Sequence, residues 1–304
     1  MVYRSSPMTL NLTQTGNWLR DRALELFIYP SIWVAAGLAS LTAFSQAMMG
    51  LQTDWRPIAF VFFVALIPYN LDRLFDAYVQ QSRNAKAQAY FRANFALLGL
   101  VAVAISSVGV LLWFAPTAVR YVSLAVVFPL VYGAPIFPLR RKNQWRWYRL
   151  KDIPGAKAWI VCGIITYATI ALPLAYAQTG FDTRAGLTTC FIFAFEGSNA
   201  NLFDVRDLES DANKGVLTLP LMVGVTGSRM ILTAMNLVML AIVIGYGGMF
   251  LLPFSPAIFL ATFFTLVLIW TVDEDTPLLF YDLVIDGLLF LPAIVTVISD
   301  PIIM

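Results

Sequence analysis

Residues 201–211 read Asn-Leu-Phe-Asp-Val-Arg-Asp-Leu-Glu-Ser-Asp, and this polar stretch directly follows a long apolar segment. Four of its residues are separated by steps of three, three and four, the spacing that aligns side chains on one face of a helix. The aligned residues are Asn201, Asp204, Asp207 and Asp211. The stretch therefore predicts an acidic cluster at the end of an apolar helix.

The composition around this stretch excludes a soluble protein. Hydrophobic residues make up 59% of the 304 residues and charged residues only 12%, whereas globular domains carry about 25% charged residues. A chain this apolar has too few polar residues to cover its own surface. The sequence thus predicts an all-α integral membrane protein, a single domain over residues 1–304.

Nine apolar runs have a length near the ~20 residues that a transmembrane helix needs. They cover residues 25–49, 57–78, 93–114, 118–137, 157–177, 184–203, 226–249, 254–272 and 279–299. All but three of the 20 Lys and Arg residues then lie on the side of the N-terminus, the exceptions being Arg56, Arg120 and Arg184. By the positive-inside rule, the N-terminus and the acidic stretch are cytoplasmic and the C-terminus lies on the opposite side.

Two further groups of acidic residues lie in apolar segments, where each charge costs about 2.5–3.5 kcal/mol at the bilayer centre. Asp72 and Asp76 have i, i+4 spacing at the cytoplasmic end of the second predicted span, and Asp282 and Asp286 repeat that spacing in the ninth. Glu196 lies near the middle of the sixth. Because the second and sixth spans run in the same direction, their acidic ends share one side. The motifs at 70–76 and 201–211 also suggest a weak internal repeat of four-helix units.

Two acidic clusters at one depth repel each other unless cations lie between them. The chain contains no histidine, so a metal would be bound by carboxylate and carbonyl oxygen, which favours Mg²⁺, with Mn²⁺ as a possible substitute. Mg²⁺ bridges carboxylates to a diphosphate in many enzymes. The alternative interpretation is that these acids are solvated helix ends that anchor the helices at the interface.

Basic residues gather at 140–152, between the fourth and fifth predicted spans. The simplest interpretation is orientation in the membrane and contact with anionic lipid headgroups. Lys151 and Lys157 differ because they open the fifth span, where they are able to approach a phosphate. Nucleic-acid binding requires a soluble basic surface and is not expected.

Residues 204–220 read Asp-Val-Arg-Asp-Leu-Glu-Ser-Asp-Ala-Asn-Lys-Gly-Val-Leu-Thr-Leu-Pro. This stretch closely resembles the second aspartate-rich motif of the UbiA superfamily of intramembrane prenyltransferases, including the trailing Gly-x-x-Thr-Leu-Pro. The resemblance extends over nearly the whole chain and implies nine helices in a UbiA-like bundle around a central cavity. The first motif departs from the family pattern, since Pro68 stands where the family has Asn and Asn70 follows two residues later.

The resemblance implies a Mg²⁺-dependent prenyltransferase that ionises an allylic isoprenyl diphosphate and transfers the prenyl group to a hydrophobic acceptor, aromatic or a quinone precursor. The implied catalytic residues are Asp72, Asp76, Asp207 and Asp211. The implied metal ligands are these four with Asp204, Asn201 and Asn70. The candidates for binding the diphosphate are Arg73, Arg83, Lys151, Lys157 and Arg206. Aromatic candidates for stabilising the carbocation are Phe63, Tyr69, Phe75, Tyr132 and Phe203.

Three alternatives remain open at the level of sequence. A membrane terpene cyclase of the UbiA type would capture the carbocation with the double bonds of the same prenyl chain and need no acceptor. An ion-coupled transporter would also contain intramembrane acids, although its site is expected near the midplane. A scaffold subunit without activity is the third. Sequence alone assigns neither the isoprenoid chain length nor the roles of Glu196, Asp282 and Asp286.

Overall fold

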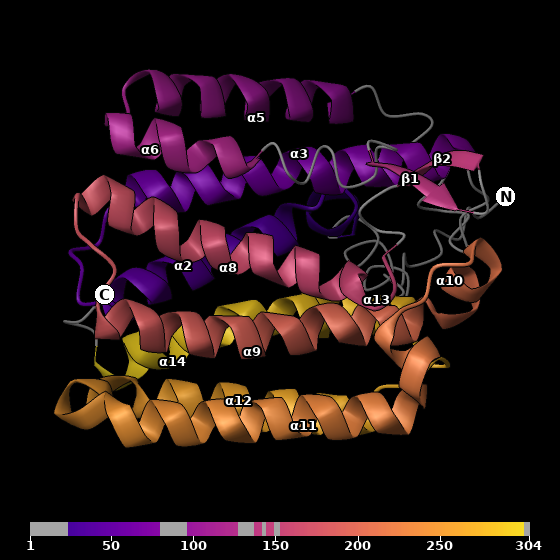
Figure 1. Ribbon diagram of the computed structural model, residues 1–304. Helices are drawn as coiled ribbons and strands as arrows, with labels where there is room; N and C mark the ends of the chain where they lie inside the picture. The colour runs from indigo at the N-terminus through magenta and orange to yellow at the C-terminus, as the bar shows by residue number, and fades with distance from the viewer. Residues whose placement is uncertain (1–23, 80–95, 127–136, 142–143, 149–152, 301–304) are drawn as a thin grey trace, which may run out of the picture.

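The computed structural model describes residues 24–79, 96–126, 137–141, 144–148 and 153–300. The long helices lie side by side and alternate in direction (Figure 1). The first half contains η1 (Leu24–Ile28), α2 (Ile32–Met48), α3 (Trp55–Val79), α5 (Ala96–Trp113), α6 (Thr117–Val122) and η2 (Ser123–Val126).

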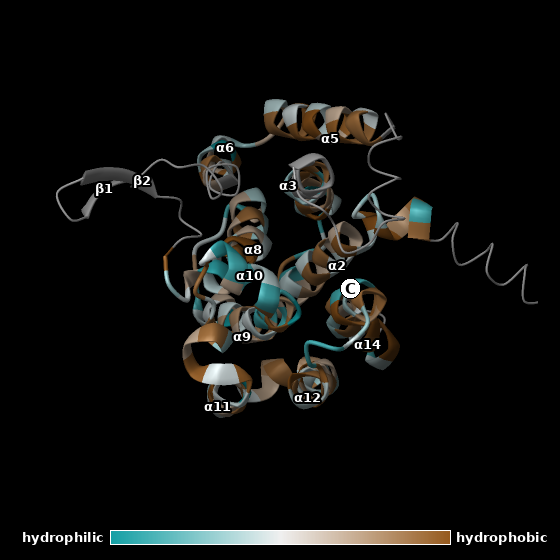
Figure 2. Ribbon diagram, turned by 90° about the vertical axis from the view of Figure 1, so that its right-hand side faces the viewer, coloured by the Kyte–Doolittle hydropathy of each residue, from teal (hydrophilic) through white to brown (hydrophobic). Residues whose placement is uncertain are grey.

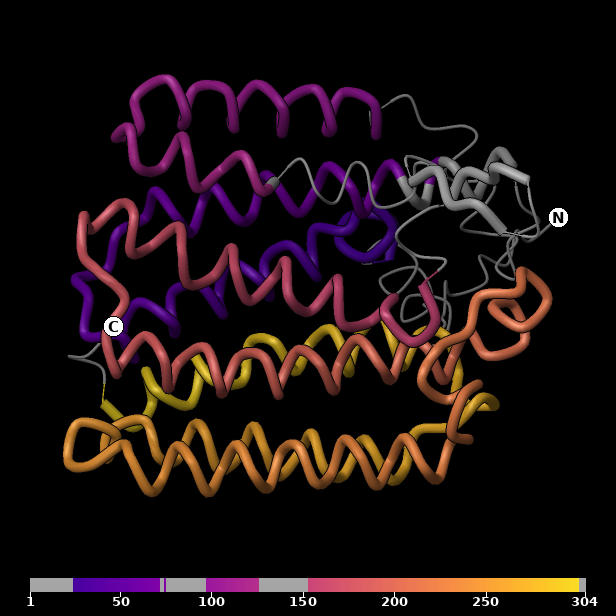
Figure 3. The backbone as a smooth tube through the Cα atoms, viewed as in Figure 1, coloured from indigo at the N-terminus to yellow at the C-terminus, as the bar shows by residue number. Residues whose placement is uncertain are grey.

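The second half begins with α8 (Ala156–Ala177) and α9 (Thr183–Arg206), which are followed by the short α10 (Leu208–Lys214). The tube in Figure 3 shows how the chain then folds back and forth. The remaining elements are α11 (Leu219–Gly247), η4 (Gly248–Phe254), α12 (Ser255–Thr271), α13 (Leu278–Phe280), η5 (Tyr281–Ile285), η6 (Asp286–Phe290) and α14 (Leu291–Ser299).

These helices confirm the predicted all-α membrane fold. Among the described residues, three helical stretches are long and apolar enough to cross a membrane: Ala156–Ala177, Leu219–Thr271 and Leu278–Ser299. The second contains both α11 and α12. Shorter apolar helices cover Ile32–Met48, Trp55–Leu71 and Leu97–Trp113. The fourth predicted span, 118–137, begins in α6 and continues outside the described residues, so the count of nine stays a prediction.

The lipid-facing surface is visible in the apolar side chains that α11 and α12 leave exposed. Met230, Leu237, Val238, Phe259 and Phe263 are all more than 45% exposed. In water such a band would be unfavourable, whereas in a bilayer it contacts acyl chains while each helix satisfies its own backbone hydrogen bonds. The chain is a multi-pass membrane protein.

The interior of the bundle is formed by helices that bury side chains on several faces. Phe44 of α2 is completely buried, and its ring centroid lies 5.6 Å from that of Phe191 on α9 and 6.1 Å from that of Phe254. Because lipid is as apolar as the core, close packing of this kind holds membrane helices together more than the hydrophobic effect does. The contact with α2 and more extensive packing against α8 and α11 hold α9, which carries most of the candidate site.

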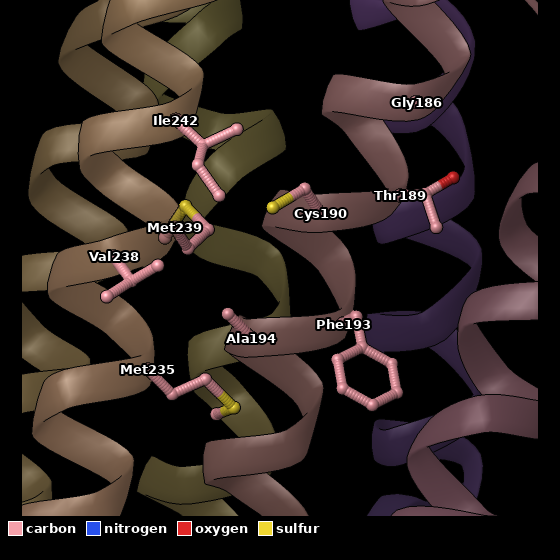
Figure 4. A pocket seen from close by; sticks show the side chains of 9 residues that line it. All are labelled: Gly186, Thr189, Cys190, Phe193, Ala194, Met235, Val238, Met239 and Ile242. Atoms are coloured by element: carbon pink, nitrogen blue, oxygen red, sulfur yellow. The ribbon is translucent and has the colours of Figure 1, made fainter.

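Two hollows each lie between a pair of neighbouring helices. The first has a volume of about 370 Å³ and lies between α9 and α11, where Cys190 and Ala194 face Met235 and Met239 (Figure 4). Another of about 490 Å³ lies between α3 and α5. The lining of the first hollow is almost entirely apolar. The central cavity implied by the resemblance stays a prediction.

Two backbone features interrupt the helices. Pro68 lies inside α3, which nevertheless continues as an α-helix to Val79, although a proline removes one backbone hydrogen bond. Gly224 has φ 76° and ψ 162°, so it breaks α11 near its start. Only glycine adopts such a conformation without strain. α11 thus begins at Leu219, before the predicted start of the span at 226.

One element was not predicted from the sequence. β1 (Phe137–Arg141) and β2 (Gln144–Tyr148) form an antiparallel hairpin in which Phe137 pairs with Tyr148 and Arg141 with Gln144. The hairpin replaces the irregular loop expected at 140–152. The alternation Trp145-Arg146-Trp147 is a period-two pattern typical of a strand, which could have indicated it.

Candidate active site at the end of α9

The C-terminal end of α9 and the N-terminal end of α8 meet around one ammonium group. Lys157 Nζ lies 2.7 Å from Asp211 Oδ2, 3.1 Å from Asp204 Oδ1 and 3.8 Å from Asp207 Oδ2. The side chains of Asp204 and Asp211 are only 3% and 7% exposed. Asp204, Asp207 and Asp211, hereafter the carboxylate cluster, thus converge on a single positive charge.

The helix is interrupted within the carboxylate cluster, at Asp207, which corrects the expectation of one continuous helical face. α9 ends at Arg206, Asp207 has φ −93° and ψ 10°, and α10 starts at Leu208. The Asp211 amide donates to the Asp207 carbonyl at 2.8 Å, so α10 begins a new helical turn there. The change of direction brings Asp211 back to the ammonium group that Asp204 contacts from α9.

Arg206 is held between an acid and two aromatic rings. Its Nε and Nη2 atoms donate to both Asp207 carboxylate oxygens at 2.8 and 3.0 Å. Its guanidinium carbon lies 4.8 Å from the ring centroid of Phe203 and 5.7 Å from that of Tyr281. Burial opposes ionisation, but the hydrogen bonds and charge of Arg206, together with Lys157 and Lys214, hold the pKa of Asp207 below its ordinary value.

The first acidic motif lies at the same end of the molecule. α3 and α9 run in the same direction, and their C-terminal ends share the end of the bundle where α10 lies (Figures 1 and 3). Asp72, Arg73 and Asp76 are in the last turns of α3. Their side chains are outside the described part of the structure. Figure 2 views the molecule from this end and shows the hydrophilic α10 over it.

The two asparagines predicted as ligands are both buried. Asn70 Nδ2 donates to the carbonyls of Pro30 at 2.9 Å and Leu66 at 2.8 Å, tying α3 to the start of α2. Asn201 Nδ2 donates to the Gly197 carbonyl at 2.7 Å. The Oδ1 atom of each has no hydrogen-bond partner among the described residues. Both amides therefore retain the oxygen that a cation or donor would use.

The basic residues proposed from sequence divide into two groups. Lys157 and Arg206 already bind carboxylates of the cluster. Arg83 and Lys151 lie outside the described residues. Among the aromatic candidates, Phe203 packs against Tyr281 with ring centroids 5.7 Å apart, and Phe63 packs edge-on against Phe62 at 5.3 Å. Tyr69 is half-buried, whereas the side chain of Phe75 and all of Tyr132 lie outside what the structure describes.

The donor set suits a cation of the Mg²⁺ type. Within the described part of the chain, no three Asp, Glu, His or Cys residues are placed as a ready-made metal site. The ammonium group of Lys157 lies among the three carboxylates of the cluster instead. The chemistry nevertheless fits, because the carboxylate cluster supplies only hard oxygen donors and the Asn201 Oδ1 atom is unpartnered one turn from Asp204.

A second polar group lies deeper in the bundle, where the sequence had shown only isolated residues. Glu196 is 2% exposed, and its Oε1 atom has no hydrogen-bond partner among the described residues. Asp286 of η6, 7% exposed, is near enough for its charge to act on Glu196. Asn199, one turn along α9, also has an unpartnered Oδ1. The i, i+3 spacing of Glu196 and Asn199 was the available signal.

Comparison with solved structures identifies the arrangement. The apo structure of a UbiA homolog from Aeropyrum pernix K1 superposes with a TM-score of 0.58 over 91% of this chain and 99% of that one, at 14% sequence identity. The chain has the UbiA fold. A structure described as digeranylgeranylglyceryl phosphate synthase in membranes gives a TM-score of 0.50 at 14% identity, over 92% of this chain and 96% of that one.

Sequence comparisons add nothing to this result. No protein-family model matches the sequence, and no curated protein matches it. The UbiA-like fold that the resemblance implies is therefore confirmed, over almost the full length of the chain. It places the carboxylate cluster at one end of a UbiA-type bundle.

Proposed function

We propose that this protein is a Mg²⁺-dependent intramembrane prenyltransferase that ionises an allylic isoprenyl diphosphate and transfers the prenyl group to a hydrophobic acceptor. The observation that carries the proposal is the convergence of Asp204, Asp207 and Asp211 on Lys157 at one end of a UbiA-type bundle. The end of α3 that carries Asp72 and Asp76 lies at the same end. The first comparison structure is a UbiA homolog and the second a synthase in membranes.

In this proposal Asp72 and Asp76 hold Mg²⁺ from one side and the carboxylate cluster holds it from the other, with Asn201 and Asn70 as additional oxygen donors. Bound Mg²⁺ would supply positive charge for the leaving diphosphate. The arrangement is cytoplasmic, because the positive-inside rule places the N-terminus there.

The chain's own residues have separate tasks around the leaving group. Lys157 keeps the carboxylate cluster assembled and offers a cation to a phosphate oxygen. Arg73, Arg83 and Lys151 are the other basic candidates. Arg206 acts mainly by fixing Asp207, since both its hydrogen bonds go to that carboxylate. Preorganised charges of this kind stabilise charge that develops in the transition state.

The prenyl chain is suited to the interior of the bundle. A carbocation forms as the allylic C–O bond breaks and the bonding electrons leave with the diphosphate. Apolar helices keep water from that cation, and the faces of aromatic rings such as Phe203 stabilise positive charge. An acceptor carbon then supplies the electrons for the new C–C bond, and its proton is released.

The test is a diphosphate-release assay on the full chain in detergent, with Mg²⁺ and allylic diphosphates of several lengths. We expect release by the wild type, and a loss of at least about 100-fold in Asp72→Ala and in Asp207→Ala. Glu209→Ala is the matched control, because Glu209 is an exposed acid on α10 outside the carboxylate cluster. Undiminished release in both aspartate variants would contradict the proposal.

Product analysis by mass spectrometry, with and without candidate acceptors, separates transfer from cyclisation. A prenylated acceptor supports transfer. A cyclic hydrocarbon formed without acceptor would assign the protein to the UbiA-type terpene cyclases instead. Ion flux in proteoliposomes that is independent of Mg²⁺, with no diphosphate release, would favour the transporter.

A further inference from the structure

The deep polar group on α9 has no task in the ionisation step. Glu196 is eight residues before Asp204, which places it about 12 Å further into the bundle at the helical rise of 1.5 Å per residue. A diphosphate held at the carboxylate cluster does not extend that far. Glu196 therefore requires an explanation of its own.

Burial without a partner is costly for a carboxyl group. Glu196 is 2% exposed, and its Oε1 atom has neither a hydrogen bond nor an ion pair with any described residue. An ionised carboxylate in such a place is strongly unfavourable, and even an uncharged polar group loses free energy when it lacks a hydrogen bond. Polar groups of this kind in membrane spans commonly mark substrate sites.

The charged group that acts on Glu196 is another acid. Asp286 acts on it electrostatically from η6, and the Asn199 Oδ1 atom on α9 is also unpartnered. The buried thiol of Cys162 on α8 donates instead to the Phe193 carbonyl at 3.2 Å. A partner for the Glu196 Oε1 atom is a hydrogen-bond donor, and the two neighbouring acids Glu196 and Asp286 disfavour a negatively charged group.

Residues on one side of α9 lie between Glu196 and the carboxylate cluster. Phe203, seven residues after Glu196, lies against Tyr281 of η5, and Asp286 follows Tyr281 by five residues along the antiparallel last span. The negative charges of Asp282 and Asp286 interact electrostatically with Arg206. The interface between α9 and η5–η6 thus connects the two polar groups through aromatic rings.

We propose that Glu196, with Asp286 and Asn199, forms a subsite for the prenyl acceptor, and that it selects a neutral acceptor carrying a hydroxyl group over an anionic one. This inference rests on the proposed function. The acceptor hydroxyl donates to the unpartnered oxygen of Glu196, while the acceptor carbon that is to be prenylated lies nearer to the carboxylate cluster. An aromatic ring spans the intervening distance. Glu196 is accordingly a positioning residue.

The experiment measures binding directly, so that its result does not depend on turnover. The full chain in detergent, without diphosphate substrate, is titrated with a neutral alkyl hydroquinone, with its dimethyl ether, and with an alkyl benzoate anion, using the shift in Tm as the readout. We expect the hydroquinone to bind about tenfold more tightly than the ether, which has the same ring and no O–H group. The benzoate is expected to bind more weakly still.

Variants then assign the effect to Glu196. Glu196→Leu should weaken hydroquinone binding about tenfold, whereas Glu196→Gln, which keeps an acceptor oxygen, should restore most of it. Thr189→Val is the matched control, because it removes a hydroxyl from α9 at the hollow facing α11, and it should leave binding unchanged. In turnover assays Glu196→Leu should raise the KM of the acceptor more than it lowers kcat.

Several results would overturn the inference. They are equal binding of the hydroquinone and its ether, tightest binding of the benzoate, no binding of any probe to the wild type, or hydroquinone binding that survives Glu196→Leu. If Glu196→Leu changed the products formed from an allylic diphosphate alone, Glu196 would act on the prenyl chain. That result would also overturn the inference. Absence of diphosphate release with normal hydroquinone binding would instead contradict the proposed function.

Discussion

Two acidic regions, one at the C-terminal end of α9 and one in its middle, differ in how their negative charge is compensated. At the end of the helix, three carboxylates share the ammonium group of Lys157, and Asp207 also binds Arg206 through two hydrogen bonds. In the middle of the same helix, Glu196 is as deeply buried as Asp204, at 2% exposed, and has no basic partner among the described residues.

The difference teaches what each region is suited to bind. A cluster that already surrounds one cation is arranged for cations, and its three carboxylates carry enough negative charge to hold Mg²⁺ beside the ammonium group. A lone buried acid beside a second acid is suited to an uncharged hydrogen-bond donor instead. One helix therefore offers a charged region for a leaving group and a polar region for a neutral ring.

The strongest way to break this comparison is to remove one charge from the end cluster while keeping its shape. Asp211→Asn is nearly isosteric and takes away the carboxylate nearest to Lys157, 2.7 Å from it. We expect diphosphate release to fall by about 100-fold or more, because stabilisation of the leaving group depends on the cation held there. The measurement is release at saturating Mg²⁺.

Glu209→Gln makes the same chemical change at an exposed position of α10 and should release diphosphate at the wild-type rate. Equal effects of the two substitutions would mean that general acidity of α10, rather than the cluster, matters.

The second prediction removes the ammonium group. Lys157→Gln leaves three carboxylates without their shared cation, and breaking a buried ion pair from one side destabilises a protein by about 3 kcal/mol. We expect a clearly lower Tm in EDTA. Addition of Mg²⁺ should raise the Tm of Lys157→Gln more than that of the wild type, since the metal replaces the missing charge.

Lys157→Arg keeps the charge and serves as the control, with a Tm in EDTA closer to the wild type. If Mg²⁺ shifts all three proteins equally, the cluster is not where the metal binds.

The sequence predicted the elements that lipid imposes. Runs such as 157–177 and 184–203 coincide with α8 and α9 because any spanning helix must be apolar over about 20 residues, whatever its neighbours are. The motif at 204–220 predicted the UbiA fold for a comparable reason, since it is local in sequence. The confirmation came from structure comparison at only 14% identity.

The contacts between helices could not be predicted in this way. Lys157 was expected to face a phosphate, and nothing local shows that it reaches Asp204, 47 positions away in the chain. The proximity of Glu196 and Asp286 depends on how α9 packs against η6. The break at Asp207 was hidden by helical spacing that continues across it.

A third and smaller prediction concerns the opposite end of α9. Asp182 caps this helix, since its Oδ1 accepts a hydrogen bond from the Ala185 amide at 2.8 Å. Loss of such a cap costs about 1 kcal/mol. Asp182→Ala should therefore lower the Tm slightly while leaving diphosphate release and the response to Mg²⁺ unchanged, because the cap is one helix length from the cluster. Asp182→Asn, which keeps a capping oxygen, should be milder.

The smallest expected effect tests whether burial, rather than ion pairing as such, makes the Lys157 cluster important. Asp54, in the loop before α3, pairs with Arg56 through hydrogen bonds to both carboxylate oxygens, and the side chain of Arg56 is 44% exposed. Burial alone would raise the pKa of Asp54, but the hydrogen bonds from the side chain and backbone of Arg56 lower it below 3.8.

A lowered folded-state pKa means that this pair stabilises the protein above the ordinary pKa of Asp and that the contribution disappears as the pH falls through the folded-state pKa. An exposed pair contributes less than about 1 kcal/mol. Asp54→Asn should therefore lower the Tm only slightly at pH 7, and the difference from the wild type should shrink below pH 3.8. A loss as large as that in Lys157→Gln would show that solvent does not screen the Asp54 pair, and that burial does not distinguish the two sites.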